Sequence, residues 1–349
     1  MKREFALDLL RVLACFLVIW QHVSEYYYIG SDFLPVREAS TYTIGFLTSL
    51  GRSAVPLFVM ISGYFLLPMR GTEREFFSKR FVRIIGPFVF WGIAYAIYYM
   101  YSRGESLTQC LQHIASIPVN FGTEIGHMWY IYVLIGLYLL VPIISPWLQQ
   151  VSKRSLQVYL GIWFVTSLLP YIHLIFPEIW GECYWNPTPM LYYFTGFGGY
   201  FVLGFYLKKF GSPSKPVSFL LILLGYIITV WVFNERIETA MSIADLELSW
   251  GQCTGNVVMI SLGIFSLVHS VSLKGESVIG NFITDCGIKG YGMYLAHLMI
   301  LTEVMAFGKD FTGSVLIEIP VLSVIVFFLT YIVIKVLSYL PKSKYWLGN

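Results

Sequence analysis

The chain has 349 residues, of which 57% are apolar, 18% aromatic and only 12% charged. Its mean hydropathy of +0.68 excludes an ordinary soluble domain and is typical of an integral membrane protein, whose surroundings are a lipid bilayer. The net charge of +3 is spread over short loops, which excludes the long basic surface of a nucleic-acid-binding protein. The five cysteines show no paired spacing, so the sequence indicates neither a disulfide framework nor a metal site.

Apolar segments long enough to cross a bilayer core as helices recur along the whole sequence. A spanning helix needs about 20 such residues. We therefore expect an all-α, polytopic membrane protein, with one bundle of about ten transmembrane helices that accounts for residues 1–349 as a single domain. The predicted spans cover roughly 5–28, 45–68, 82–101, 128–148, 156–176, 190–208, 217–234, 253–270, 289–307 and 315–339.

The basic residues predict the orientation of this bundle. With the N-terminus inside, the inner segments carry 16 Lys and Arg residues, whereas the outer segments carry four, namely Arg37, Arg103, Arg236 and Lys309. Cytoplasmic loops retain basic residues, so we expect both termini in the cytoplasm. The outer loops 176–189 and 234–250 are acidic and aromatic and are candidates for binding a partner outside. Residues 105–127 are of mixed polarity and predict an interfacial or re-entrant segment.

The first span carries polar side chains on one helical face. Arg11 and His22 are eleven positions apart, which places them only about 20° apart around a helix and about 16 Å apart along it. Asp8 precedes Arg11 by three residues, a spacing at which helical side chains meet. A charge within the bilayer is costly unless it is paired or hydrated, so this face should point into the protein. One interpretation is an Asp8–Arg11 anchor with His22 as a structural hydrogen-bonding group; another is a functional site.

The second and third spans add further cations. Arg52 lies in the outer half of the second span, where a salt bridge to a residue such as Glu25 is one interpretation and ligand binding another. Ser62 and Gly63, in the same segment, predict a close contact between helices. Arg80 and Arg83 lie just inside the membrane. Their guanidinium groups suit phosphate binding, although positive-inside anchoring explains them equally well.

The later spans contribute an aromatic residue and a second histidine. Trp129 opens the fourth span, where it is a candidate for packing at the membrane interface. In the ninth span Tyr294 and His297 are three residues apart and line adjacent parts of one helical surface. A structural hydrogen bond and a role in ligand binding both remain open for His297.

These segments, taken together and in order, resemble the acyltransferase-3 family of integral-membrane acyltransferases, in particular its stand-alone O-acetyltransferase type, such as the enzymes of enterobacterial common antigen. The resemblance is carried by "RVLACFLVIWQH" (11–22), "RSAVPLFVMISGYFLL" (52–67), "KRFVRIIGPFVFW" (79–91), "GHMWYIYVLIGLYLLVP" (126–142) and "YGMYLAHL" (291–298). The first three segments contain the family's Arg-x10-His pattern, its Pro-Leu-Phe-x-x-x-Ser-Gly stretch and its Arg-x-x-Arg motif. The last segment contains its Tyr-Leu-x-His element.

The resemblance implies a multi-pass enzyme of the bacterial inner membrane. It implies transfer of an acetyl group from cytoplasmic acetyl-CoA, without a metal, to a hydroxyl of an extracytoplasmic cell-surface glycan or lipid-linked sugar. His22 is then the expected general base, since a neutral imidazole can take the proton of a hydroxyl, and Arg11 shares its face. Arg80 and Arg83 are expected to bind CoA. Candidate donor or acceptor contacts are Arg52, Trp129, Tyr294 and His297.

A secondary transporter is the alternative function, because buried Arg, His and carboxylate groups also suit proton-coupled transport of a small solute. Transporter folds often contain repeated halves with interrupted helices at matching places. The sequence shows no such symmetry, which favours the enzyme.

Overall fold

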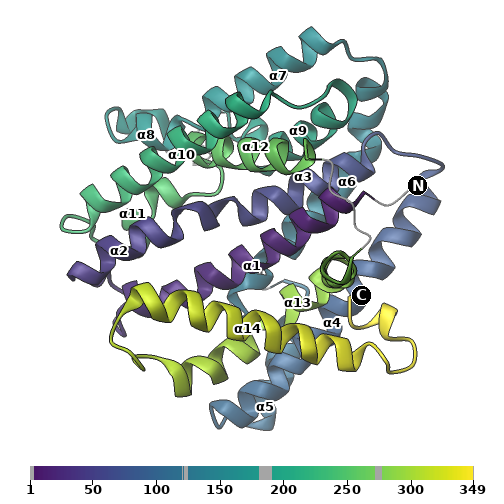
Figure 1. Ribbon diagram of the computed structural model, residues 1–349. Coiled ribbons are helices and arrows are strands. Elements are labelled where there is room, and N and C mark those ends of the chain that lie inside the picture. The colour runs from purple at the N-terminus through teal and green to yellow at the C-terminus, as the bar shows by residue number, and fades with distance from the viewer. Residues whose placement is uncertain (1–3, 120, 122–124, 181–190, 272–276, 349) are drawn as a thin grey trace.

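The computed structural model describes residues 4–119, 121, 125–180, 191–271 and 277–348, which fold almost entirely into helices. The predicted all-α fold is confirmed. The short helices are α5 Leu107–Ser116, α8 Leu169–His173 and α11 Ile243–Leu246. The bundle in Figure 1 is built mainly from α1 Phe5–Tyr28, α2 Ala39–Thr48, α3 Ala54–Leu66, α4 Glu73–Ser102, α6 Trp129–Gln150, α7 Lys153–Thr166, α9 Phe197–Phe210, α10 Lys215–Arg236, α12 Gly255–His269, α13 Val278–Gly308 and α14 Val315–Leu337.

Eight helical segments within the described residues are long and apolar enough to cross a membrane. They correspond to eight of the predicted spans. Of the other two, 190–208 overlaps α9 and 289–307 lies within α13. α9 has only 14 residues, and α13 has 31 and includes Asp285 and Lys289. The protein is therefore a polytopic membrane bundle, as predicted.

The second predicted span, 45–68, is not one continuous helix. The 3-10 turn η1, Ser49–Ser53, separates α2 from α3 and contains Arg52. Serine and glycine are weak helix formers in this turn, and the buried Gln21 side chain of α1 donates a hydrogen bond of 2.6 Å to the Gly51 carbonyl. Irregular backbone is tolerated at membrane depth where the protein satisfies it in this way.

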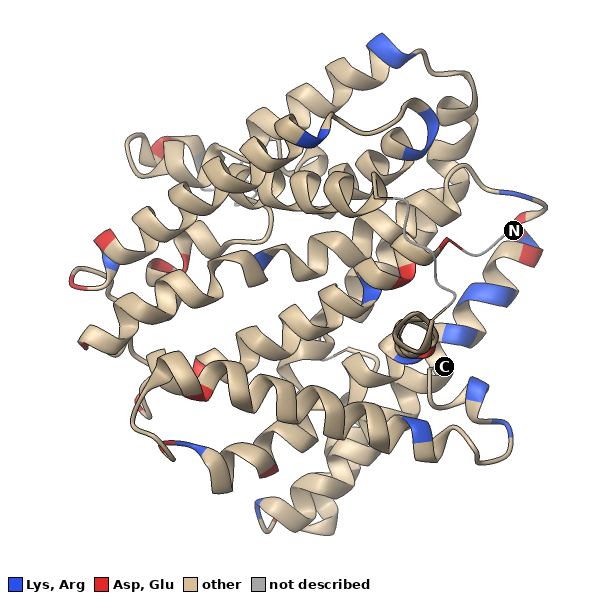
Figure 2. Cartoon of the chain, viewed as in Figure 1, with Lys and Arg blue, Asp and Glu red and all other residues tan. Residues whose placement is uncertain are grey.

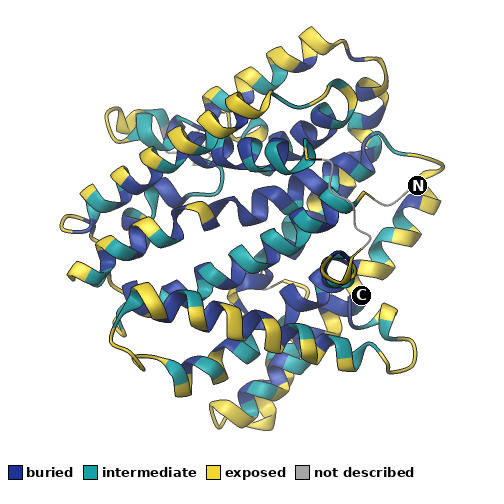
Figure 3. Cartoon of the chain, in the orientation of Figure 1, coloured by how far each residue is buried: buried dark blue, intermediate teal, exposed yellow. Residues whose placement is uncertain are grey.

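Helix α1 lies in the middle of the bundle, where it packs against α3, α13 and α14 (Figure 1). Its Leu7, Leu10 and Ile19 side chains are completely buried. Buried residues gather inside the bundle and exposed ones on its outer faces (Figure 3). Many exposed side chains are apolar, such as Leu316 and Ile332 of α14, which suits a surface covered by lipid rather than water.

Two glycines let α3 and α9 approach each other closely. A Cβ placed on Gly63 would lie 1.8 Å from the carbonyl oxygen of Phe201, and one on Gly204 would lie 1.9 Å from the carbonyl oxygen of Met60. The helix backbones are thus in direct contact, as small residues allow in membranes. The close contact predicted at Gly63 is confirmed.

Both termini lie at one end of the bundle (Figure 1). Glu4 accepts a hydrogen bond of 2.9 Å from the Tyr64 hydroxyl, and the Gly348 carbonyl accepts one of 3.1 Å from the Gly292 amide. Most Lys and Arg residues gather towards this end, whereas Asp and Glu are prominent at the other (Figure 2). This distribution supports the predicted cytoplasmic location of the termini.

Several residues used in the predictions lie outside the described residues. They are Lys2, Arg3 and Lys274 of the inner segments, residues 181–189 of the outer loop 176–189, and residues 120 and 122–124 of the segment 105–127. The described part of 105–127 forms α5 and ends in the 3-10 turn η2, Gly126–Met128.

Candidate active site

A cavity of about 710 Å³ opens at the end of the bundle that holds both termini. Helices α1, α3, α4, α6 and α13 and the C-terminal segment all contribute to its walls. Its outer part is charged and its inner part is largely aromatic. The lining residues include Glu4, Asp8, Arg11, Phe58, Ser62, Phe65, Arg80, Arg83, Tyr130, Leu134, Tyr138, Gly287, Gly290, Tyr291, Tyr294, Lys344 and Gly348.

Four basic side chains surround the mouth of this cavity: Arg11, Arg80, Arg83 and Lys344. Arg80 and Arg83 come from the first part of α4, one turn apart on the same face. Helix α4 begins well before its predicted span because Thr72 caps it through a reciprocal capping box. The structure therefore places both arginines of the Arg-x-x-Arg motif on the wall of the cavity.

Arg11 also lies at this mouth and makes the local ion pair that its spacing predicts. Its Nη1 is 2.7 Å from Oδ1 of Asp8, and its guanidinium carbon lies 5.0 Å from the centre of the Phe65 ring. Asp8 itself is buried. Pairing of this kind offsets the cost of placing a charge within the membrane.

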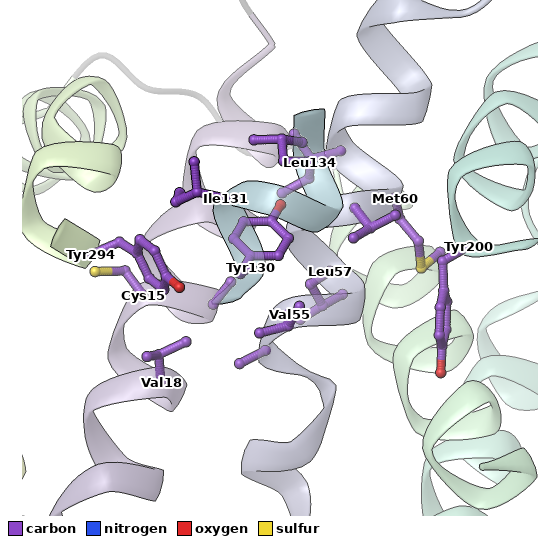
Figure 4. Packing of buried hydrophobic residues seen from close by; sticks show 14 of the residues in the cluster. Cys15, Val18, Val55, Leu57, Met60, Tyr130, Ile131, Leu134, Tyr200 and Tyr294 are labelled. Carbon is purple, nitrogen blue, oxygen red and sulfur yellow. The ribbon is translucent and has the colours of Figure 1, made fainter. Parts of the chain in front are cut away.

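The inner end of the cavity is formed by three aromatic rings. The ring centres of Phe58 and Tyr130 are 6.3 Å apart, those of Phe58 and Tyr294 are 6.4 Å apart, and those of Tyr130 and Tyr294 are 5.7 Å apart. Figure 4 shows both tyrosines within the buried cluster, with Cys15 and Val18 of α1 in the same region. This inner end is thus apolar except for hydroxyl groups.

A row of three histidines continues inward from Tyr294. The ring centres of His22 and His297 are 5.3 Å apart, and those of His297 and His127 are 4.9 Å apart. His297 follows Tyr294 by three residues and continues the face of α13 that lines the cavity. The row therefore joins three separate elements, α1, α13 and η2.

No role is predicted from sequence for His127, which lies in the 126–142 segment. In the structure it is buried, its ring centre is 5.4 Å from that of Tyr294, and its carbonyl accepts a hydrogen bond from the Tyr294 hydroxyl. Its position two residues before Trp129, at the start of a long apolar span, was the available signal.

The hydrogen bond between His22 and Glu25 fixes the protonation pattern of the His22 ring. The Nδ1 atom of His22 lies 2.8 Å from Oε2 of Glu25, three residues along α1. An ionised carboxylate only accepts hydrogen bonds, so Nδ1 carries a proton, and in the neutral ring Nε2 keeps a lone pair. The side chains of His22 and Glu25 are 22% and 33% exposed, whereas His297 is completely buried. His22 is thus the most exposed member of the row.

Arg52 does not line the cavity, and it forms the salt bridge that was one interpretation, although with Glu247 rather than with Glu25. Its Nη2 is 3.3 Å from Oε1 of Glu247 and donates to the Tyr28 hydroxyl at 3.1 Å. Its guanidinium carbon lies 4.0 Å from the centre of the Trp250 ring. The 3-10 turn at the break of the second span directs Arg52 to this cluster, a partnership that no local sequence pattern encodes.

Trp129 does not line the cavity either. Its ring centre is 6.2 Å from that of Tyr130 and 5.7 Å from that of Phe197. It therefore supports a residue of the cavity wall by packing. Within the described residues, no cluster of three or more His, Cys, Asp or Glu side chains is arranged to hold a metal ion.

The geometry agrees with what family comparison shows. Residues 4–339 match the model of the acyltransferase 3 family, which is described as an acyltransferase domain. No curated protein and no solved structure matches the chain. The match covers nearly the whole bundle, including the histidine row and all of the cavity wall except its C-terminal residues, and it favours the enzyme over the transporter. The chain belongs to the acyltransferase 3 family and is a membrane-bound acyltransferase.

Proposed function

We propose that this protein moves an acetyl group from cytoplasmic acetyl-CoA to a hydroxyl of an extracytoplasmic cell-surface glycan or lipid-linked sugar. It would do so as a stand-alone O-acetyltransferase in the bacterial inner membrane. The observation that carries this proposal is the cavity itself, which runs from a basic mouth at the end of the termini to Tyr294. There the histidine row begins, and His22 is its most accessible member.

The two ends of the cavity suit the two ends of an acyl-CoA molecule. The phosphates of CoA match the guanidinium groups of Arg80 and Arg83, which can form charge-assisted, bidentate hydrogen bonds. The aromatic inner end, with Phe58, Tyr130 and Tyr294, suits the uncharged thioester arm. We assign Arg11 to the donor as well, because it lines the mouth about 16 Å along α1 from His22.

His22 is the general base in this proposal. Its Nε2 takes the proton of the acceptor hydroxyl while the hydroxyl oxygen attacks the thioester carbonyl carbon. The carbon–sulfur bond then breaks, CoA leaves as the thiolate, and the proton on His22 is available to neutralise it. Glu25 stabilises the imidazolium that forms in between, since its carboxylate is hydrogen-bonded to Nδ1 at 2.8 Å.

The acceptor approaches from the opposite side of the membrane. Arg52 and Glu247 lie in the outer half of the bundle by the predicted orientation, where polar side chains can contact a sugar. Glu247 belongs to the acidic outer loop 234–250 and remains a quarter exposed at its side chain. Trp129 contributes by supporting Tyr130.

The decisive experiment compares the wild type with His22→Ala in nanodiscs supplied with acetyl-labelled CoA and extracted bacterial surface glycans. We expect label in the glycan with the wild type and a loss of turnover of about 100-fold or more in the variant, which is the usual contribution of a general base. His173→Ala is the matched control, because His173 is distant in sequence from the site and bonds locally to the Pro177 carbonyl. Wild-type turnover by His22→Ala contradicts the assignment of the base.

A further inference from the structure

Two buried histidines present unpaired lone pairs beside the site. His297 Nδ1 lies 2.6 Å from the carbonyl oxygen of Tyr294, and His127 Nε2 lies 3.2 Å from the carbonyl oxygen of Leu295. A carbonyl oxygen only accepts hydrogen bonds, so each of these nitrogens carries a proton. Both rings are buried, and because a buried charge is costly each ring is neutral. The other nitrogens, His297 Nε2 and His127 Nδ1, therefore carry lone pairs, and both are buried without a hydrogen-bond partner among the described residues.

Two neighbouring hydroxyl groups already donate to backbone carbonyls. The Tyr294 hydroxyl donates to the His127 carbonyl, and the Tyr95 hydroxyl donates to the Leu295 carbonyl at 3.0 Å. The rings of both tyrosines lie about as close to His127 as the His297 ring does. Buried polar atoms are normally satisfied, so these two lone pairs point to a ligand that brings hydrogen-bond donors into the histidine row.

We propose that the lone pairs of His297 and His127 accept hydrogen bonds from further hydroxyls of the acceptor, next to the hydroxyl that His22 activates. This inference rests on the proposed function and narrows its substrate class to acceptors with neighbouring hydroxyl groups. The reacting carbonyl and sulfur of a thioester have no hydrogen to donate, whereas a sugar does. The ring centres of His22 and His297 are only 5.3 Å apart, a spacing that adjacent hydroxyls of one sugar ring can bridge.

His297 binds in this scheme and transfers no proton. The proton of the attacked hydroxyl goes to His22, and the neighbouring hydroxyl keeps its own while it donates to His297 Nε2. A site built around such a hydrogen bond discriminates strongly, because an acceptor that lacks the second hydroxyl leaves the buried nitrogen unpaired. His297 is thus a specificity-determining residue.

The test separates the kinetic constants of acceptor and donor for two variants of His297. The assay uses acetyl-labelled CoA and the glycan extract that the wild type acetylates. His297→Leu removes the lone pair, and we expect kcat/KM for the acceptor to fall about 10- to 100-fold with the donor KM unchanged. His297→Gln places a carbonyl oxygen near the position of Nε2 and should recover most of the loss. If His297 were only structural, His297→Gln would not restore the kinetic constants of the acceptor alone.

His127→Leu and His127→Asn form a second pair in case His297→Leu fails to fold, since the Asn oxygen can replace Nδ1. The same pattern is expected there. A change in the donor KM with unchanged acceptor constants would assign the lone pairs to an N–H group of the donor and overturn the proposal. Equal loss in the Leu and polar variants of both positions would also overturn it. Failure of the wild type to acetylate any glycan contradicts the proposed function instead.

Discussion

Glu25 is the side chain whose charge acts most directly on His22. Replacing it in Glu25→Gln keeps an oxygen that can accept from Nδ1 but removes the negative charge that stabilises the imidazolium. We expect kcat to fall about tenfold or more while the donor KM stays the same, as measured by acetyl transfer in nanodiscs. Glu303→Gln is the control, because Glu303 accepts a hydrogen bond from Tyr98 at 2.7 Å in an exposed pair. An unchanged kcat in Glu25→Gln would show that the pair is only structural.

The two arginines of α4 give a second residue-scale prediction. If Arg80 and Arg83 hold the phosphates of CoA, the double change Arg80→Ala with Arg83→Ala removes charge-assisted hydrogen bonds and should raise the donor KM about tenfold or more. The acceptor KM should not change. Arg74→Ala with Lys79→Ala is the matched control, since these basic residues of α4 are not among the residues that line the cavity. An equal rise of the donor KM in both double variants would mean that all four basic residues act only as positive-inside anchors.

How far the site follows from sequence depends on the distance between partners along the chain. The Asp8–Arg11 pair and the shared face of Arg11 and His22 follow from helical periodicity. The contact of Arg52 with Glu247 joins residues 195 positions apart. The hydrogen bond from the Tyr294 hydroxyl to the His127 carbonyl joins residues 167 positions apart. Such contacts depend on how the helices pack and on where a helix breaks. Helical periodicity predicts neither of these.

At the scale of elements, the contact between α3 and α9 is the most sharply defined. A Cβ at position 63 would lie 1.8 Å from the Phe201 carbonyl, so Gly63→Ala must push the helices apart. We expect a cost of about 1–3 kcal/mol, as for other overpacked sites, seen as a lower Tm in detergent. Gly161→Ala in α7 is the control, because its Cβ meets nothing within 4 Å and alanine favours a helix. A Tm of Gly63→Ala at or above that of the wild type would contradict the contact.

The helices themselves were largely predictable, whereas their interruptions were not. Most predicted spans match a helix, because a segment of about 20 apolar residues can satisfy its backbone hydrogen bonds in a bilayer by forming one. The break at Ser49–Ser53 lies inside the predicted span 45–68, and it is stabilised by Gln21 of another helix. A feature that depends on a hydrogen bond from a distant helix leaves no mark on local hydropathy. Charge can extend a helix beyond its apolar run as well, as Asp285 and Lys289 do in α13.

At the scale of the whole molecule, the cavity opens at the end of the bundle that holds the termini. Its mouth lies beside Glu4, Lys344 and Gly348, so the donor and both termini should share one side. His22 and Glu25, further along α1, retain partly exposed side chains and lie towards the other side by the predicted orientation. A bundle with the cavity on one side and His22 towards the other would carry the acetyl group across the bilayer without moving CoA itself, whose charged phosphates cannot enter lipid unaided.

This arrangement predicts that acetyl-CoA is used only from the side of the termini. Proteoliposomes with the acceptor glycan sealed inside and the donor outside should acetylate the trapped glycan through those molecules whose termini face outwards. An N-terminal tag, cleaved by a protease that cannot cross the membrane, measures the outward fraction, and the rate should rise in proportion to it. Detergent added to the same samples removes the dependence, because both faces are then accessible. Transfer that is independent of the outward fraction in sealed vesicles would mean that the cavity beside the termini does not receive the donor.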